Sequence, residues 1–308
     1  MPTIRLAYRD HDRTPVIYCI KAMAERHYGV HVIGLQIEER HAFENALFND
    51  QCDVIIEHTE YLYPEAAKGR TIALFCAPQI HRGLKLVVPQ TFAALDELRG
   101  RAMAVRDLGR PHAITLWLRK MGLEKEVRTV IVRDQEIGRW QQWRKVASHE
   151  CAACFVAPIY LPPALDAGLK TFPVEEAEIV SNFAQACLSQ FAPRNPALMK
   201  DYMKAVIHAL ALLSYRRDEA MEIIAKEPMR LMKITDRAEL RRQVDSIAEM
   251  LHVKPYPTAE AIVNSNEIAA HEYGARIENP VTLWDLHWVK ELDDEGFIDE
   301  LVASLSVR

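Results

Sequence analysis

Ionisable side chains repeatedly follow short apolar runs in this sequence, and such runs are expected to form buried strands. Arginine carries a permanent, planar charge that fits a carboxylate, which makes it a natural contact for an anion. The candidate ligand-binding residues come from several separate segments: Arg9, Arg13, Glu57, Thr59, His81, Arg82, Arg106, Arg110 and His112. Together they would suit a small anionic ligand, and in particular a carboxylated, partly aromatic one.

Two histidines in the first part of the chain are candidates for proton transfer. His11 and His58 each follow the end of an expected strand, and Glu57 directly precedes His58. If the ligand is a hydroxylated aromatic acid, loss of CO₂ leaves electrons on a ring carbon, and a histidine could protonate that carbon. A divalent metal ion could act as an electron sink, with His11, Glu57 and His58 as candidate ligands. No spacing specifies a metal, so the cofactor stays open.

The segments that would position these residues alternate between strand and helix patterns. Residues 3–8, 31–37 and 52–57 are typical of strands, and residues 16–29 and 41–50 carry apolar side chains at helical spacing. This order predicts an α/β fold whose mostly parallel sheet is covered by helices. In such a sheet, ligands bind outside the carboxyl ends of the strands, where the candidate residues are expected.

The pattern then restarts, which predicts a second lobe. Strands are expected at residues 101–105, 127–132 and 151–157, with a helix at 111–122 and another around 135–147. From Pro196 onward the chain reads as mostly helical.

Two extended segments, residues 83–89 and 182–191, flank this second unit and look like paired crossings between lobes. We therefore expect a discontinuous first lobe, residues 1–82 plus 190–308, with the second lobe, residues 83–189, inserted into it. The ligand is expected to bind between the two lobes.

Composition narrows the class of protein. The chain has 308 residues, 49% of them hydrophobic, and a formal net charge of -5. This balance argues against a nucleic-acid surface, which needs a basic field. The N-terminal residues lack the pattern of a secretory leader, and no window predicts a membrane span. We therefore expect a cytoplasmic protein, or a periplasmic one if a leader has been removed, and leave open whether it forms a homo-oligomer.

The six cysteines fit buried free thiols better than disulfides, because most of them lie in apolar runs. Cys151 and Cys154 have the spacing of a zinc or redox pair. No second pair of cysteines or histidines follows at the distance a zinc site needs. We therefore expect no metal chemistry at this pair.

The order of elements resembles the type II periplasmic-binding-protein fold over nearly the whole chain. The features that carry this resemblance include the segment Ala42–Leu62, the restart at Leu95–Val105 and the Asn195-Pro196-Ala197 start of the C-terminal helices. A narrower resemblance concerns Asp10-His11-Asp12-Arg13-Thr14, which is similar to the N-terminal Asp-Tyr-Asp-Arg-Thr phrase of 4,5-dihydroxyphthalate decarboxylase-like proteins. Here His11 replaces the tyrosine.

The narrower resemblance implies a cytoplasmic carboxy-lyase, a decarboxylase of small hydroxylated aromatic carboxylates that serves aromatic compound catabolism. The broader one implies an alternative, a substrate-binding protein of an ABC transporter or a ligand sensor, which needs affinity without catalysis. A dehydratase or synthase of menaquinone or pyrimidine synthesis is a third hypothesis, and we favour it less. Fold alone does not choose among them.

Overall fold

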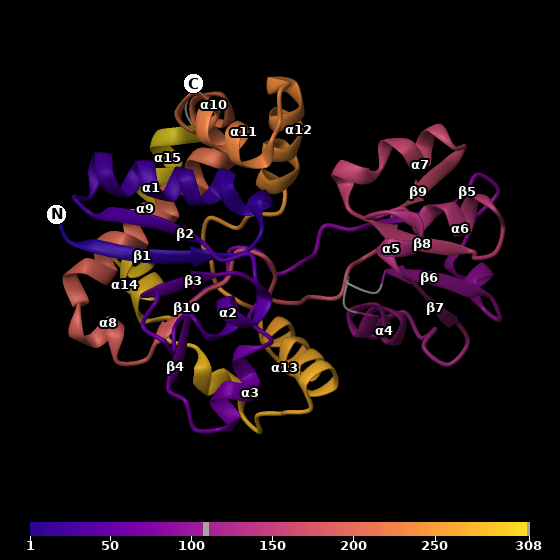
Figure 1. Cartoon of the computed structure of the whole chain (residues 1–308), viewed down its shortest axis with the longest axis horizontal. Helices are drawn as coiled ribbons and strands as arrows, with labels where there is room; N and C mark the ends of the chain where they lie inside the picture. Colours follow the sequence, from indigo (N-terminus) through magenta and orange to yellow (C-terminus); the bar gives the residue numbers. More distant parts are fainter. Residues whose placement is uncertain (107–110, 307–308) are drawn as a thin grey trace. The chain divides into compact units, whose positions relative to one another are not determined.

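The computed structural model describes residues 1–106 and 111–306, and the chain divides into two compact units (Figure 1). Unit 1 comprises Met1–Ile80 and Val180–Arg308, and unit 2 comprises His81–Ile179. Residues 180–189 thus belong to unit 1, whereas the sequence prediction placed them in the inserted lobe, and residues 81 and 82 belong to unit 2, whereas it placed them in the first lobe. The physical reason for the first difference is that a strand in residues 180–189, β10, pairs with two strands of unit 1.

Each unit is built around one five-stranded sheet. The strand order is β2-β1-β3-β10-β4 in unit 1 and β7-β6-β8-β5-β9 in unit 2. In both sheets three neighbouring strands are parallel, and the fourth is antiparallel to both of its neighbours. In each unit, the antiparallel strand lies next, along the sequence, to a point where the chain passes from one unit to the other. The α/β class with mostly parallel sheets is therefore confirmed, and the two units share one topology.

The strands of unit 1 are β1 (Thr3–Tyr8), β2 (His31–Gln36), β3 (Val54–Ile56), β4 (Ile72–Cys76) and β10 (Gln185–Leu188). Those of unit 2 are β5 (Lys85–Pro89), β6 (Ala102–Arg106), β7 (Arg128–Val132), β8 (Ala153–Val156) and β9 (Leu169–Phe172).

Helices of unit 1 pack on both faces of its sheet. They are η1 (His11–Arg13), α1 (Thr14–His27), α2 (Arg40–Asn45), α3 (Leu62–Ala67), α8 (Phe191–Arg194), α9 (Pro196–Tyr215), α10 (Arg217–Ile224), α11 (Lys226–Met232), α12 (Arg237–Ala248), α13 (Ala259–Tyr273), η5 (Pro280–Leu283), α14 (His287–Asp294) and α15 (Phe297–Ser306). No helix in residues 1–106 and 111–306 has the length and apolar character needed to cross a membrane.

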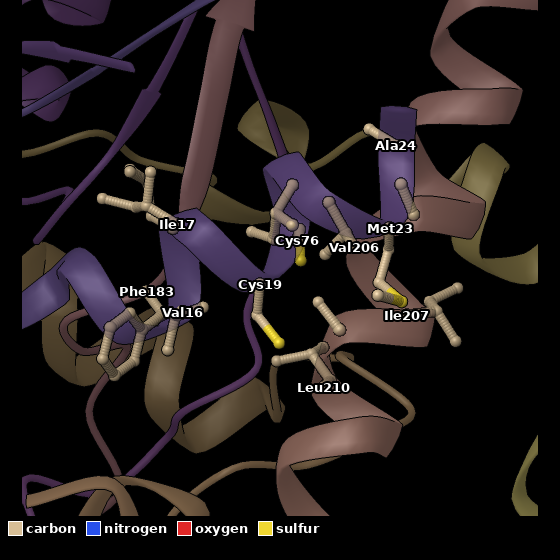
Figure 2. Packing of buried hydrophobic residues seen from close by; sticks show 14 of the residues in the cluster. Val16, Ile17, Cys19, Met23, Ala24, Cys76, Phe183, Val206, Ile207 and Leu210 are labelled. Carbon is tan, nitrogen blue, oxygen red and sulfur yellow. The ribbon is translucent and has the colours of Figure 1, made fainter. Parts of the chain in front are cut away.

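The core of unit 1 follows from the alternation of side chains along its strands. Leu6 and Tyr8 of β1 face one side of the sheet and join the cluster formed with α1 and α9, while Ala7 faces the other side and joins a cluster with α2, α3 and α13. Figure 2 shows the α1–α9 contact, where Cys19 and Leu210 are buried together. Both faces of this sheet are therefore covered, which leaves its strand ends as the places open to a ligand.

Unit 2 has shorter helices. They are η2 (Leu95–Leu98), α4 (Pro111–Lys120), α5 (Asp134–Ile137), α6 (Trp143–Ala147), η4 (Pro158–Tyr160) and α7 (Pro162–Asp166).

The sequence predicted a single helix around residues 135–147, and that prediction is wrong. The segment forms α5 and α6 instead, separated by a loop in which Gly138 has φ 92° and Trp140 has φ 60°. Neither of these backbone conformations can continue a right-handed helix.

Candidate functional site

The loops after β1 and β3 are joined by a buried ion pair between Arg13 and Glu57, 44 residues apart in the sequence. The chain leaves β1 at Tyr8, makes the single turn η1, and starts α1 with Thr14, whose hydroxyl donates to the carbonyl oxygen of His11 at 2.6 Å. This turn directs Arg13 inward, so that only 3% of it is exposed, while Glu57 is 4% exposed. The ion pair fixes the two loops side by side at the carboxyl ends of parallel strands.

The charge of Arg13 is already balanced by its neighbours. Its guanidinium donates to Asp12 at 2.6 Å and to the side-chain oxygen of Asn182 at 3.2 Å, and Asp10 lies 3.7 Å away. Asn182 comes from the segment that precedes β10, so three separate segments meet here. Arg13 and Glu57 were predicted as ligand contacts, but in the structure their side chains are engaged with one another and with this network. The pair holds the two loops together, and contact of either side chain with a ligand stays a prediction.

Burial raises the pKa of Glu57 above its ordinary value, because it penalises the ionised carboxylate. The positive charge of Arg13 and a hydrogen bond from the backbone N–H of His58 act in the opposite direction. More weakly, Asp10 raises this pKa and Arg9 lowers it. Glu57 therefore has a cationic partner that offsets part of its desolvation.

Arg9, His11 and His58 are the cationic or titratable candidates with exposed surface at this edge, and the side chain of His11 is 36% exposed. The Arg9 side chain is 30% exposed, and its nearest acidic contact is Asp10, at 3.5 Å. The His58 side chain is 18% exposed, and its Nε2 lies 3.7 Å from Glu57. Both side chains follow directly from the ends of β1 and β3. Contact of these side chains with a ligand stays a prediction, while Arg13 and Glu57 are buried beside them.

His11 and Thr59 are placed differently. The Nε2 atom of His11 lies 2.9 Å from the amide nitrogen of Gln36 and 3.7 Å from Glu38, so this ring faces the end of β2. Thr59 is 1% exposed, and its carbonyl oxygen accepts a hydrogen bond from Leu62 in the turn that leads into α3. Thr59 therefore shapes the turn and has little surface to offer a ligand.

The three candidate metal ligands do not come together as a metal site. Within residues 1–106 and 111–306, no group of three or more histidine, cysteine, aspartate or glutamate side chains is arranged to hold a metal ion. His11 points to Gln36 and Glu57 is engaged by Arg13. Cys151 and Cys154 are buried free thiols.

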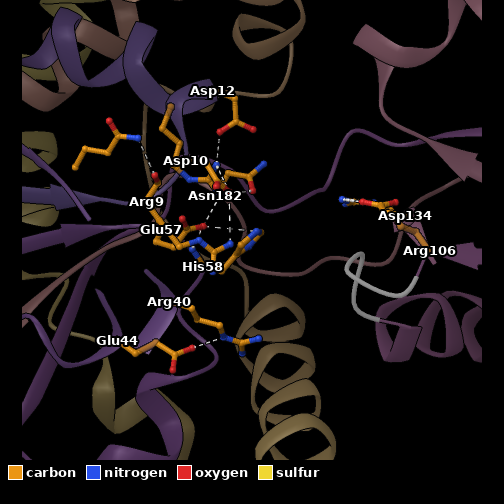
Figure 3. A network of polar contacts seen from close by, with 12 residues as sticks. Arg9, Asp10, Asp12, Arg40, Glu44, Glu57, His58, Arg106, Asp134 and Asn182 are labelled. Atoms are coloured by element: carbon orange, nitrogen blue, oxygen red, sulfur yellow. Dashed lines mark hydrogen bonds and ion pairs between the residues drawn. The ribbon is translucent and has the colours of Figure 1, made fainter. Parts of the chain in front are cut away.

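In unit 2, the predicted residue Arg106 is held by an acidic partner. Its guanidinium donates to both carboxylate oxygens of Asp134, from Nε at 2.8 Å and 2.9 Å, with a further contact from Nη2 (Figure 3). The same guanidinium lies over the ring of Trp140, 4.6 Å from the ring centroid. Neither Asp134 nor Trp140 was predicted from the sequence, because both come from the segment that was expected to be a helix.

Among the other candidates of unit 2, Arg82 lines a small hollow of about 30 Å³ together with Trp117 and Phe155. His112 is 8% exposed and lies in the first turn of α4. His81 belongs to the same unit, and its charge lowers the pKa of Glu176, which burial raises. Arg110 lies outside the described residues.

Solved structures share the fold of this chain at low sequence identity. A putative periplasmic sulfonate-binding protein of an ABC transporter from Methylobacillus flagellatus superposes with a TM-score of 0.71 at 14% identity, covering 97% of this chain and 96% of that chain. The chain has the type II periplasmic-binding-protein fold. The aliphatic sulphonate-binding protein of Escherichia coli matches with a TM-score of 0.62 at 13% identity, covering 89% of this chain and 92% of that one.

A Candida albicans protein, described as defining a new family with the generic periplasmic binding protein fold, matches with a TM-score of 0.54 at 15% identity over 95% of each chain. No family model matches the sequence, and no curated protein matches it. The closeness to 4,5-dihydroxyphthalate decarboxylase-like proteins finds no counterpart among these three structures. Two of them are described as periplasmic.

Proposed function

We propose that this chain is a substrate-binding protein that captures a small organic anion, a sulfonate or a carboxylate, for an ABC transporter or as a sensor. The observation that carries the proposal is the edge of unit 1, where the buried Arg13–Glu57 pair holds Arg9 and His58 at the ends of β1 and β3. This placement at the carboxyl ends of parallel strands is where ligands bind in open α/β sheets.

The chemistry of the edge supports binding better than catalysis. A decarboxylase must stabilise charge on a ring carbon and deliver a proton. Glu57 and Arg13 are occupied by each other, and the described part of the chain holds no group of ligands for a metal ion. Binding needs only a charged contact and a fixed loop geometry, and Arg9 beside the Arg13 network offers both.

The direct test is calorimetric titration with a panel of alkyl and aryl sulfonates and carboxylates. A charge-assisted hydrogen bond contributes about 1.5–3 kcal/mol, so Arg9→Gln should weaken binding by about 10- to 100-fold. Arg26→Gln is the matched control, because it removes the same charge from an exposed position at the other end of α1. Equal effects of the two substitutions, or no binding of any anion by the unmodified chain, would overturn the proposal.

A lyase that decarboxylates a hydroxylated aromatic carboxylate is the second candidate, and the position of His58 near Arg9 favours testing it. Incubation with hydroxyphthalates, with and without divalent metal ions, would show CO₂ release if this candidate holds. His58→Gln would then abolish turnover while leaving affinity nearly unchanged. A binding protein would release no CO₂ under any of these conditions.

Two neighbours of this fold are described as periplasmic, and we propose the same location for this chain. Fractionation of its host followed by immunoblotting tests this directly. Detection of the chain solely with cytoplasmic markers would contradict it and would favour the sensor over the transporter component.

A further inference from the structure

Unit 1 contains a cavity of about 600 Å³ between α2 and α3. Tyr61, Glu65 and Lys68 line it from α3 and its two ends, and His41 and Asn45 line it from α2. Residues three or four positions apart lie on one side of a helix, so each of the two helices turns one face toward the cavity. The lining residues all belong to unit 1, and the volume is that of an ordinary small-molecule site.

The wall of this cavity holds a hydroxyl group without a protein partner. Tyr61 is 6% exposed, and its hydroxyl forms no hydrogen bond within residues 1–106 and 111–306. The ring is held by an edge-on contact with Phe43, with the ring centroids 5.9 Å apart. A buried hydroxyl that lacks a partner is costly, and native proteins nearly always supply one. Because Tyr61 lines the cavity, a molecule held there is placed to be that partner.

The Tyr61 hydroxyl keeps its proton at neutral pH. Burial raises the pKa of Tyr61 well above its ordinary value, and the negative charges of Glu57 and, more weakly, Glu44 raise it further. A protonated phenol donates one hydrogen bond and can also accept one. The group therefore suits a ligand that carries a hydroxyl or a carbonyl oxygen.

The charged side chains around the cavity are paired with one another. Glu65 accepts a hydrogen bond from Lys68 at 2.7 Å and lies 2.9 Å from the Nε of Arg70, one cation on each carboxylate oxygen. Glu44 accepts a hydrogen bond from Arg40 at 2.7 Å (Figure 3). Since each of these carboxylates already has a cation beside it, the lining favours a neutral polar ligand over a charged one.

The remaining groups of the wall are of the kinds that bind hydroxyls. Tyr273, the last residue of α13, adds a second ring, whose hydroxyl accepts a hydrogen bond from Arg40 at 2.6 Å. The amide of Asn45 donates to the carbonyl oxygen of His41 at 2.8 Å, which fixes its orientation. Amide, carboxylate and phenol groups offer donors and acceptors side by side, and the tyrosine rings add apolar surface. A polyhydroxy compound matches this combination, because its hydroxyls donate and accept while its C–H groups are apolar.

We propose that this cavity binds a neutral polyhydroxy compound, a monosaccharide or a polyol, which accepts a hydrogen bond from the Tyr61 hydroxyl. The site goes beyond the proposed anion-binding function, since neither Arg9 nor His58 lines the cavity. A chain with both sites would bind a sugar and an anion independently.

Saturation-transfer difference NMR on the whole chain tests the proposal with glucose, galactose and mannitol as probes, and with glycine and glutamine as zwitterionic controls. The neutral probes should show saturation transfer, and the zwitterions should not. Tyr61→Phe removes only the hydroxyl and should weaken sugar binding by about 3- to 10-fold, the loss expected for one hydrogen bond. Asn45→Trp, which places a large side chain in the cavity, should abolish sugar binding.

Two controls separate a binding role of the hydroxyl from a structural one. Tyr63→Phe makes the same change at a fully buried tyrosine of α3 that does not line the cavity, and it should leave sugar affinity unchanged. Because the Tyr61 hydroxyl has no protein partner in the described part of the chain, Tyr61→Phe should not lower the midpoint of urea unfolding. A structural hydroxyl would lower that midpoint.

The outcomes keep this proposal distinct from the proposed function. Failure of all three neutral probes to bind overturns the sugar site and means that the Tyr61 hydroxyl is paired with water only. Equal losses of affinity in Tyr61→Phe and Tyr63→Phe, full sugar affinity in Asn45→Trp, or binding of the zwitterions alone also overturn it. Each of these results leaves anion binding intact, whereas loss of anion binding in Arg9→Gln with unchanged sugar affinity supports two separate sites.

Discussion

Replacement of Arg13 by methionine should destabilise unit 1 more than any single change at a surface ion pair. Methionine keeps much of the volume and removes the charge, so Glu57, which is 4% exposed, loses its main cationic partner. The carboxylate retains the hydrogen bond from the backbone N–H of His58 at 3.0 Å. Breaking a buried pair from one side in this way costs about 3–5 kcal/mol.

Replacement of Arg13 and replacement of Glu57 should not lower the free energy of unfolding by the same amount. In Glu57→Gln, Arg13 still donates to Asp12 at 2.6 Å and to Asn182 at 3.2 Å, so its charge remains partly balanced. We therefore expect a smaller loss for Glu57→Gln, of about 1–3 kcal/mol, which is typical of a buried polar group that loses one partner. The double substitution Arg13→Met with Glu57→Leu removes both charges and should be more stable than Arg13→Met alone.

The cost of Arg13→Met should also depend on pH. Burial already raises the pKa of Glu57, and removal of Arg13 raises it further. A carboxyl group whose pKa is raised on folding binds more protons in the folded state than in the unfolded state. The stability of the chain therefore falls as the pH rises from the pKa of the unfolded state through the pKa of the folded state. The gap between the variant and the unmodified chain should therefore be larger at pH 8 than at pH 5.

Urea unfolding followed by circular dichroism at both pH values measures these differences. Arg40→Met is the matched control. Arg40 pairs with Glu44 (Figure 3), and the side chain of Arg40 is 58% exposed. Exposed ion pairs of this kind contribute about 0–1 kcal/mol to stability. This account of the network would be refuted if Arg13→Met lowered the free energy of unfolding no more than Arg40→Met does. It would also be refuted if the loss in Arg13→Met were equal at pH 5 and pH 8.

The remaining predictions concern the core, a histidine and a helix cap. All six cysteines are buried, and burial raises the pKa of the Cys19 thiol to about 12. A thiol reagent should therefore label none of them until the chain unfolds, and fast labelling of the native chain would contradict this. Burial lowers the pKa of His208 to about 4, so this group's contribution to stability should be lost as the pH falls from about 6.5 toward 4, and His208→Asn should flatten that part of the curve measured by thermal melts. Leu210→Ala, at a fully buried position against α1, should cost about 3 kcal/mol in urea unfolding, and a loss below about 1 kcal/mol would mean that the site is loosely packed. Asp236→Ala removes the side chain that caps α12 through the N–H of Ala238 at 2.8 Å and should cost about 1 kcal/mol, with Asp236→Asn as the control that retains a cap.

Much of the fold was predictable because it depends on local periodicity. The alternation at residues 3–8 and the helical spacing from Ile17 to Met23 depend only on neighbours in the sequence, and the structure forms β1 and α1 there. The helix expected around residues 135–147 failed for a reason that was partly visible, since Gly138 weakens a helix interior. The positive φ of Trp140 was not visible, because tryptophan is not a residue type that favours this backbone conformation.

By itself the sequence determined which residue types follow each strand, and therefore which chemistry is present at the strand ends. Only the tertiary structure decided how those residues are used. Arg9 and Arg13 look equivalent in the sequence, yet the turn of η1 buries Arg13 against Glu57 and leaves Arg9 30% exposed. The strand order brings β6, β7 and β8 together, and with them Arg106, Trp140 and Tyr160. The physical reason is that a charge or a ring finds its partner through sheet pairing between distant segments, and sheet pairing is decided by the packing of the whole unit.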